Sequence, residues 1–307
     1  MTTTSNNLNW WERITLEVLW ILCRLFGLLP LFVQYRIVAP FIYFVVYKVF
    51  RYRVKVVDDN LAHAFADRSE VERAEIKDKF YTTLSEVFVS IIALSNPRME
   101  GKFEDPNDMT TQAAKLREQM KGRNWVALLA HIGLWEHMMF WGEYSDSYIL
   151  GAYHKLANRV VDQLFIRLRT RNHINFIALE KKYIARFCIK HRDGIEGKNF
   201  VLGLIADQHS TIYADSRWID FLGRETIFFD GGETLALKLK LPVYFIYYRR
   251  VGAGKYTLHY DMLHDGVEEV EPYEITRRYV RHLEREIRET PELWLWSHKR
   301  WKRKKRT

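Results

Sequence analysis

The chain has 307 residues, of which 48% are hydrophobic and 15% aromatic, enough for a sizeable core in one large domain or two ordinary ones. Its two cysteines, Cys23 and Cys188, are far apart in sequence, which excludes a disulfide framework or a thiolate metal cluster and fits a reducing compartment. The formal net charge is +9, and seven of the last ten residues are Lys or Arg. Such a tail binds nucleic acid or anionic lipid, unless it is simply a solvated terminus.

Residues 1–55 are predicted to anchor the chain in a membrane. Segments 16–33 and 37–50 are strongly apolar, the first long enough to cross a bilayer and the second short for a span. Pro30 and Pro40 are expected to break this region into pieces. No small-residue cleavage site follows a short apolar core, so the region is not a removable signal peptide. A single span or a shallow hairpin fits, and the alternative is an amphipathic helix pair packed on the soluble domain.

Residues 56–302 are expected to form one domain, preceded by the anchor and followed by a basic tail, residues 303–307. A cationic flank directly after the anchor places this domain in the cytoplasm. Short apolar runs alternate with helical patterns, which predicts an α/β fold with a mostly parallel sheet flanked by helices. The predicted strands are 125–130, 147–153, 175–179, 200–206, 242–248 and an edge strand at 257–262. The predicted helices are 58–96, 110–121, 159–171, 231–241 and 273–289.

His131 directly follows the apolar strand 125–130, and Glu136 follows five positions later. Histidine is the side chain best suited to moving protons near neutral pH, and a carboxylate bonded to its ring fixes the tautomer. On a regular helix the two side chains would point about 140° apart. They meet only if His131 lies on the turn before a helix, with Gly133 relaxing the backbone. The spacing matches no zinc motif, and the alternative is a buried histidine beside an unrelated surface glutamate.

Three other segments follow a recognisable pattern. They are Asp-Asn-Leu-Ala-His-Ala-Phe at 59–65, Ile-Ala-Asp-Gln-His at 205–209 and Pro-Glu-Leu-Trp-Leu-Trp-Ser-His-Lys-Arg-Trp-Lys at 291–302. With the His-x4-Glu element, and in this order, they resemble the bacterial lipid A (late) acyltransferases of the lysophospholipid acyltransferase superfamily. The resemblance runs from about residue 35 to 302, although Ala66 stands where the family usually has proline.

The resemblance implies a glycerolphosphate acyltransferase-like fold and an enzyme at the cytoplasmic face of the bacterial inner membrane. Such an enzyme moves a fatty acyl chain from acyl carrier protein, or from coenzyme A in some relatives, to a hydroxyl of a lipid acceptor. The thioester is a co-substrate, so no cofactor and no metal are expected. His131 would act as general base on the hydroxyl, with Glu136 orienting it and supporting its charge. No Gly-x-Ser-x-Gly nucleophile motif is present.

Further substrate-binding residues are implied by the family pattern. The candidates for binding phosphate or the oxyanion are Lys155, Asn158, Arg169 and Arg171. Their alternative role is that of a basic helix lying on anionic lipid. Asp207 and Gln208 are expected to line the acceptor side, unless they only cap a helix.

The expected partners are acyl carrier protein, a lipid A precursor and the membrane. Nucleic-acid binding by the tail would leave the anchor and His131 unexplained, so no nucleic acid is expected. Two other readings remain open: an acyltransferase for another lipid, such as an aminolipid, a glycolipid or a lysophospholipid, and a non-catalytic lipid-binding protein.

Overall fold

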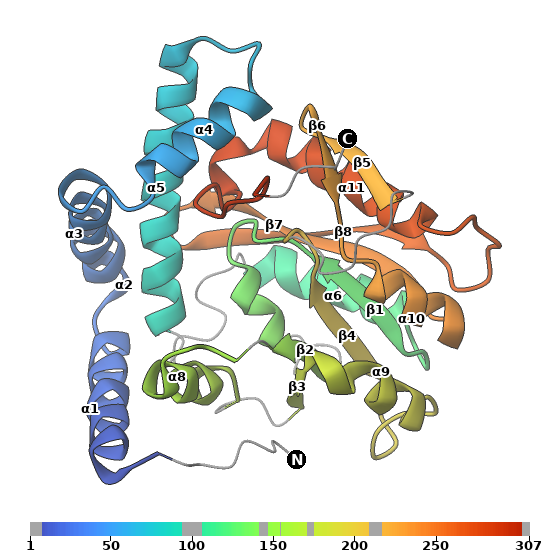
Figure 1. Ribbon diagram of the computed structural model, residues 1–307. Coiled ribbons are helices and arrows are strands. Elements are labelled where there is room, and N and C mark those ends of the chain that lie inside the picture. The colour runs from blue at the N-terminus through green and yellow to red at the C-terminus, as the bar shows by residue number, and fades with distance from the viewer. Residues whose placement is uncertain are drawn as a thin grey trace.

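The computed structural model describes residues 8–93, 106–140, 147–153, 155–170, 175–208 and 217–302. Within them a six-stranded sheet has the order β3-β2-β4-β1-β7-β8 (Figure 1). The first five strands are parallel and β8 is antiparallel to β7. This confirms the mostly parallel sheet and its predicted edge strand. The strands are β1 (Trp125–Leu129), β2 (Tyr148–Tyr153), β3 (Phe176–Glu180), β4 (Phe200–Ile205), β7 (Val243–Gly252) and β8 (Lys255–His264).

Both faces of the sheet are covered, because successive side chains of a strand point to opposite faces. Val126 and Leu128 belong to a core shared with α9, α10 and α11, whereas Ala127 and Leu129 belong to a core shared with the second half of α5 and with α6. These helices are α5 (Glu70–Ala93), α6 (Pro106–Gln119), α9 (Lys181–Lys190), α10 (Gly231–Leu239) and α11 (Glu274–Glu289). Helix α8 (Arg159–Thr170) lies beside the edge strand β3. A small hairpin, β5 (Trp218–Phe221) with β6 (Arg224–Ile227), was not predicted.

The single helix predicted for residues 58–96 is wrong, because two helices occupy this region. They are α4 (Val54–Ala64) and α5. Ser69 begins the second one with a capping box: its hydroxyl accepts from the Glu72 amide at 3.3 Å, and its own amide donates to the Glu72 carboxylate at 2.7 Å. This pair satisfies amide groups that an unbroken helix would bond internally, so the chain turns before Ser69.

The N-terminal region forms two helices at one side of the domain (Figure 1). Helix α1 spans Trp10–Gly27, and after Pro30 a continuous helix runs over Leu31–Val49. It consists of α2 (Leu31–Val33), η1 (Gln34–Val38), α3 (Ala39–Tyr43) and η2 (Phe44–Val49). The break predicted at Pro30 is confirmed, but the break predicted at Pro40 is wrong. The helix continues through Pro40, which lacks an N–H, because the preceding turn η1 is a wider π-turn. This turn is closed by a hydrogen bond from the amide of Ala39 to the carbonyl of Gln34.

The apolar segment long enough to cross a bilayer is therefore the second and not the first. Segment 16–33 does not form one helix, because the chain turns between Leu28 and Pro30. Leu31–Val49, with 19 residues, is by length and composition the one candidate span among the described residues. It is an apolar helix that could anchor the protein in a membrane.

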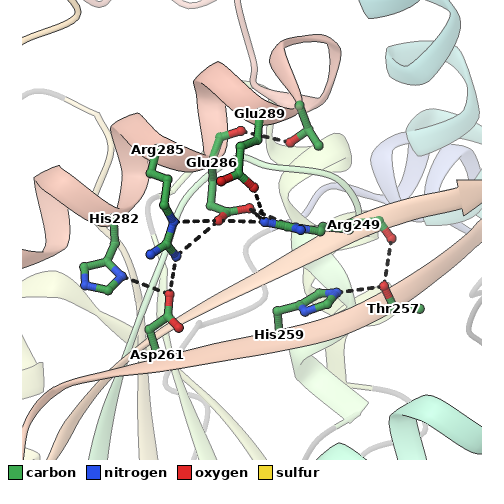
Figure 2. A network of polar contacts seen from close by, with 9 residues as sticks. Arg249, Thr257, His259, Asp261, His282, Arg285, Glu286 and Glu289 are labelled. Carbon is green, nitrogen blue, oxygen red and sulfur yellow. Dashed lines mark hydrogen bonds and ion pairs between the residues drawn. The ribbon is translucent and has the colours of Figure 1, made fainter.

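Helix α11 is fixed to the β7–β8 pair by a network of charged side chains (Figure 2). Glu286 is fully buried and accepts from Nε and Nη2 of Arg249 on β7, at 3.0 and 2.9 Å. Asp261 on β8 accepts from His282 at 2.9 Å and from Arg285 at 2.6 Å. Burial would raise the pKa of Asp261, but these two hydrogen bonds hold it below its ordinary value. The network thus bonds charged groups that would otherwise be costly to bury.

We expect Glu286→Gln to destabilise the fold by about 2 kcal/mol, because it removes the charge that faces the Arg249 guanidinium from inside the protein. The measurement is the melting temperature in detergent, which should fall by about 3 °C or more. Arg281→Ala is the control: its ion pair with Glu274 is exposed, and its loss should change the melting temperature by less than about 1 °C. Equal shifts in the two variants would contradict a stabilising role for the buried pair.

Candidate active site

The turn after β1 brings His131 to the carboxyl end of the sheet. Leu129 on β1 pairs with Ile205 on β4, so His131 and Asp207 each lie two residues beyond the same rung of the ladder. Gly133 has φ +58°, and a Cβ there would lie 2.8 Å from the carbonyl oxygen of Tyr248, so the turn requires glycine. His131 therefore lies on the turn, before the short 3-10 helix η4 (Trp135–Phe140) that carries Glu136. The conformation required for a role of His131 in proton transfer is present.

His131 is held by Asp207. Its ring Nδ1 lies 2.7 Å from Oδ1 of Asp207, and its backbone amide donates to Oδ2 at 3.0 Å. Trp294 adds a third donor, with its indole N–H 2.9 Å from the same Oδ2. The Nε2 atom lies 3.3 Å from the amide nitrogen of Gln208. The Asp207 side chain is 3% exposed and that of His131 16%, so the imidazole reaches solvent and the carboxylate does not.

The electrostatics of this pair fix the protonation of the ring. Burial would raise the pKa of Asp207, but the charge of His131 and three hydrogen bonds hold it below its ordinary value. An ionised carboxylate can only accept, so Nδ1 carries the proton and Nε2 of the neutral ring keeps its lone pair. Burial would lower the pKa of His131, yet the charge of Asp207 and its hydrogen bond raise it above the ordinary value. The arrangement is that of a general base oriented by a carboxylate.

Glu136 does not bind His131, so the contact predicted between them is wrong. Its carboxylate accepts from Nε and Nη2 of the Arg169 guanidinium, the Nε bond measuring 2.9 Å. Burial would lower the pKa of Arg169, but the charge of Glu136 raises it. A fork-shaped guanidinium fits a carboxylate better than an imidazole does, which accounts for the pairing. Glu136 acts on His131 only through space, as a weaker contribution to its raised pKa than that of Asp207.

A mostly apolar cavity begins beside this ion pair and runs over the sheet. We call it the sheet cavity; its volume is about 560 Å³ including the open mouth. The only charged groups in its lining, among the described residues, are Glu136 and Arg169. Trp135 also lines it and packs edge-on against the His131 ring, with centroids 5.0 Å apart. Its other lining residues include Met138, Gly151, Phe176 and Gly203. Such a space accepts an apolar ligand with one polar end.

Residues 6–303 match the family model of the bacterial lipid A biosynthesis acyltransferases. The chain belongs to this family. The predicted family resemblance is thereby confirmed over essentially the whole chain, and with it acyltransferase activity on lipid A-like substrates. None of the curated proteins compared with the chain matches it.

Four residues after β2 were predicted to bind phosphate or the oxyanion, and the three that the structure describes do not lie together. Arg169 belongs to the site, whereas Asn158 caps helix α8 by accepting from the amides of Val160 and Val161 at 3.0 and 3.1 Å. Lys155 is exposed, and Arg171 lies outside the described residues. The basic face of α8 is used within the protein, since its other arginines pair with acidic residues of α1. These pairs are Arg159 with Glu12 and Arg167 with Glu17.

The oxygens of Asp207 accept from His131 and Trp294, and its place on the acceptor side stays a prediction. Gln208 is the member of this acyltransferase motif that reaches Nε2 of His131. The hydrogen bond from Trp294 to Asp207 was not predicted, although Trp294 lies in the last of the motifs. That motif also provides a backbone bridge to the turn that carries His131, with the amide of Leu295 donating to the carbonyl of His131 at 3.1 Å.

We expect Asp207→Asn to lower the pKa of the His131 imidazole, because it removes the charge that raises it and leaves the burial that lowers it. Titration of the ring resonances by NMR from about pH 5 to pH 9 measures the change, with His131→Ala identifying the signal. Glu136→Gln is the matched control and should lower this pKa less. An unchanged pKa in Asp207→Asn would contradict the pairing.

Proposed function

We propose that the chain transfers a fatty acyl group from the thioester of acyl carrier protein to a hydroxyl of a lipid A precursor. The observation that carries the proposal is the oriented His131–Asp207 pair beside an apolar cavity with one ion pair at its edge. The cavity suits the acyl chain of the donor, and Arg169 is placed to meet a phosphate or the developing oxyanion. The membership in an acyltransferase family supports the same reaction class.

The proposed reaction needs one proton carrier and no covalent enzyme intermediate. Nε2 of His131 takes the proton of the acceptor hydroxyl while its oxygen attacks the thioester carbonyl carbon. When the carbon–sulfur bond breaks, the imidazolium returns the proton to the leaving thiolate. Asp207 stabilises the imidazolium meanwhile, and Gln208 occupies the position of the hydroxyl until substrate arrives.

The two N-terminal helices are proposed to hold the enzyme on the inner membrane, with the domain at its cytoplasmic face. One stripe of α1 exposes large apolar side chains at helical spacing, namely Ile14, Val18, Ile21 and Leu25. The second helix exposes Phe32, Phe41 and Phe44, each by more than half of its surface. Such uncovered apolar area marks a membrane contact.

Packing against the domain favours a helix that lies in the membrane surface over one that crosses it. Tyr35 bonds Ser90 of α5 at 2.6 Å, and Lys48 pairs with Asp78 of the same helix at 3.4 Å. The helix therefore runs antiparallel along α5 for most of its length. A crossing would carry this charged part of α5 into hydrocarbon, which is unfavourable.

We expect His131→Ala to reduce the rate of acyl transfer by roughly a hundredfold or more, the usual effect of removing a general base. The assay follows radiolabelled acyl groups from acyl carrier protein to a lipid A precursor in detergent micelles. His191→Ala, at the end of α9 on the other face of the sheet, should keep the activity within about twofold. Full activity in His131→Ala would refute the mechanism, and transfer from coenzyme A alone would refute the donor.

We expect Phe32→Glu combined with Phe41→Glu to weaken binding to liposomes by at least about a hundredfold, since each phenylalanine loses more than about 1.4 kcal/mol of burial in lipid. Flotation with liposomes of bacterial polar lipids measures it. Val71→Glu is the control, because Val71 is 70% exposed but lies on α5 and not on either of the two N-terminal helices. Alkaline carbonate should release the wild-type protein, and its retention in the pellet would favour a crossing helix.

A further inference from the structure

A second cavity lies next to His131, between α5 and the C-terminal segment. We call it the α5 cavity; its volume is also about 560 Å³ including the open mouth. Its lining residues are Tyr52, Arg53, Leu84, Val87, Phe88, Ile91, Trp135, Leu295, Ser297 and His298.

Trp135 separates this cavity from the sheet cavity, since it alone among the described residues lines both. The indole packs edge-on against the His131 ring, and Leu295, which lines the α5 cavity, bonds the His131 carbonyl. The two cavities therefore meet at Trp135 beside the His131 imidazole, one extending over the strands and the other along α5. A transfer reaction between two lipidic substrates needs two such approaches.

The chemistry of the α5 cavity is apolar with one cationic group. Its α5 wall is formed by Leu84, Val87 and Ile91, while Phe88 and Tyr52 are about two-fifths exposed. The Arg53 guanidinium donates to the carbonyl of Ser297 at 2.8 Å. No carboxylate in the described parts of the chain pairs with it, unlike the arginines of α8 that contact α1 and the sheet cavity. An anionic group on a ligand would complete the coordination of Arg53.

The position of Arg53 suits a ligand that comes from the membrane. Arg53 follows the end of the apolar helix Leu31–Val49 by four residues and precedes α4. The cavity therefore lies beside the end of the exposed apolar helix, because Tyr52 and Arg53 in its lining directly follow that helix. A lipid that enters there would leave its charged head group near Arg53 and extend its chain along α5.

We propose that the α5 cavity binds the acceptor lipid, with one of its acyl chains along α5 and a head-group phosphate on Arg53. This assignment rests on the proposed function. The donor acyl chain occupies the sheet cavity, and Trp135 keeps the two chains apart while the hydroxyl and the thioester meet at Nε2 of His131. Arg53 then determines specificity for phosphorylated acceptors, and the α5 wall determines the fit of the acceptor chain.

The test is a binding titration of a lipid A precursor without any donor, so that it does not depend on catalysis. Ile91→Trp should raise the Kd by about tenfold by filling the cavity. Arg53→Gln should raise it by a similar factor, because a charge-assisted contact to phosphate is lost. Arg51→Gln, a neighbouring exposed arginine outside the lining, should change it by less than about twofold.

Phosphatase treatment of the acceptor separates the two contributions. The effect of Arg53→Gln should disappear with the dephosphorylated lipid, whereas the effect of Ile91→Trp should remain. Unchanged Kd values in both variants, or a rise in the KM for the donor in place of the acceptor, would overturn the assignment. Absence of acyl transfer by the wild-type enzyme would instead count against the proposed function and leave the binding result standing.

Discussion

The carboxylate of Asp207 is the group on which the geometry of the site depends. It receives hydrogen bonds from the amide and ring of His131 after β1 and from the indole of Trp294 near the C-terminus. A buried carboxylate is costly unless several donors neutralise it, so its three partners are fixed relative to one another. This carboxylate therefore joins three parts of the chain, namely the turn after β1, the end of β4 and the C-terminal segment. The orientation of the imidazole is therefore a property of the whole fold.

The motif at 59–65 and the end of the motif at 291–302 hold the C-terminal segment in place. Asn60 of α4 donates to the carbonyls of Trp296 and His298, at 2.7 and 2.9 Å, and Phe65 packs on the Trp296 ring. Arg300 is 3% exposed and donates to the carbonyl of Ile227 at 2.9 Å, and burial lowers its pKa to about 10. These residues hold the C-terminal segment against the turn that carries His131. Two segments more than 200 residues apart in sequence thus contact each other and support the turn of His131 together.

The sequence predicted the elements of the site better than the contacts within it. The apolar runs before His131 and Asp207 identify two buried strands, because a run of that length between polar residues fits a parallel sheet. Which strands are neighbours is decided by the fold, and only the pairing of Leu129 with Ile205 places these two side chains together. Spacing along the chain favoured the nearby Glu136 as the partner of His131. The helix break before Ser69 has a different cause, because there a local capping box between Ser69 and Glu72 overrides a continuous apolar pattern.

Glu136 positions Arg169, although it does not contact the His131 ring. Its side chain is 9% exposed, and Arg169, with 26% exposure, arrives from the helix that follows β2. Neither charge is stable there alone, so each one positions the other at the edge of the sheet cavity. The opposite charges of Glu136 and Arg169 nearly cancel. Glu136 fixes the orientation of the guanidinium, which retains N–H groups that Glu136 does not bind. Under the proposed function, the spacing of five residues from His131 has a physical meaning: the turn would place the base on one side of Trp135, and the first turn of η4 would place the partner of Arg169 at the edge of the sheet cavity. The His-x4-Glu element would then connect proton transfer with donor binding through the backbone of one short turn.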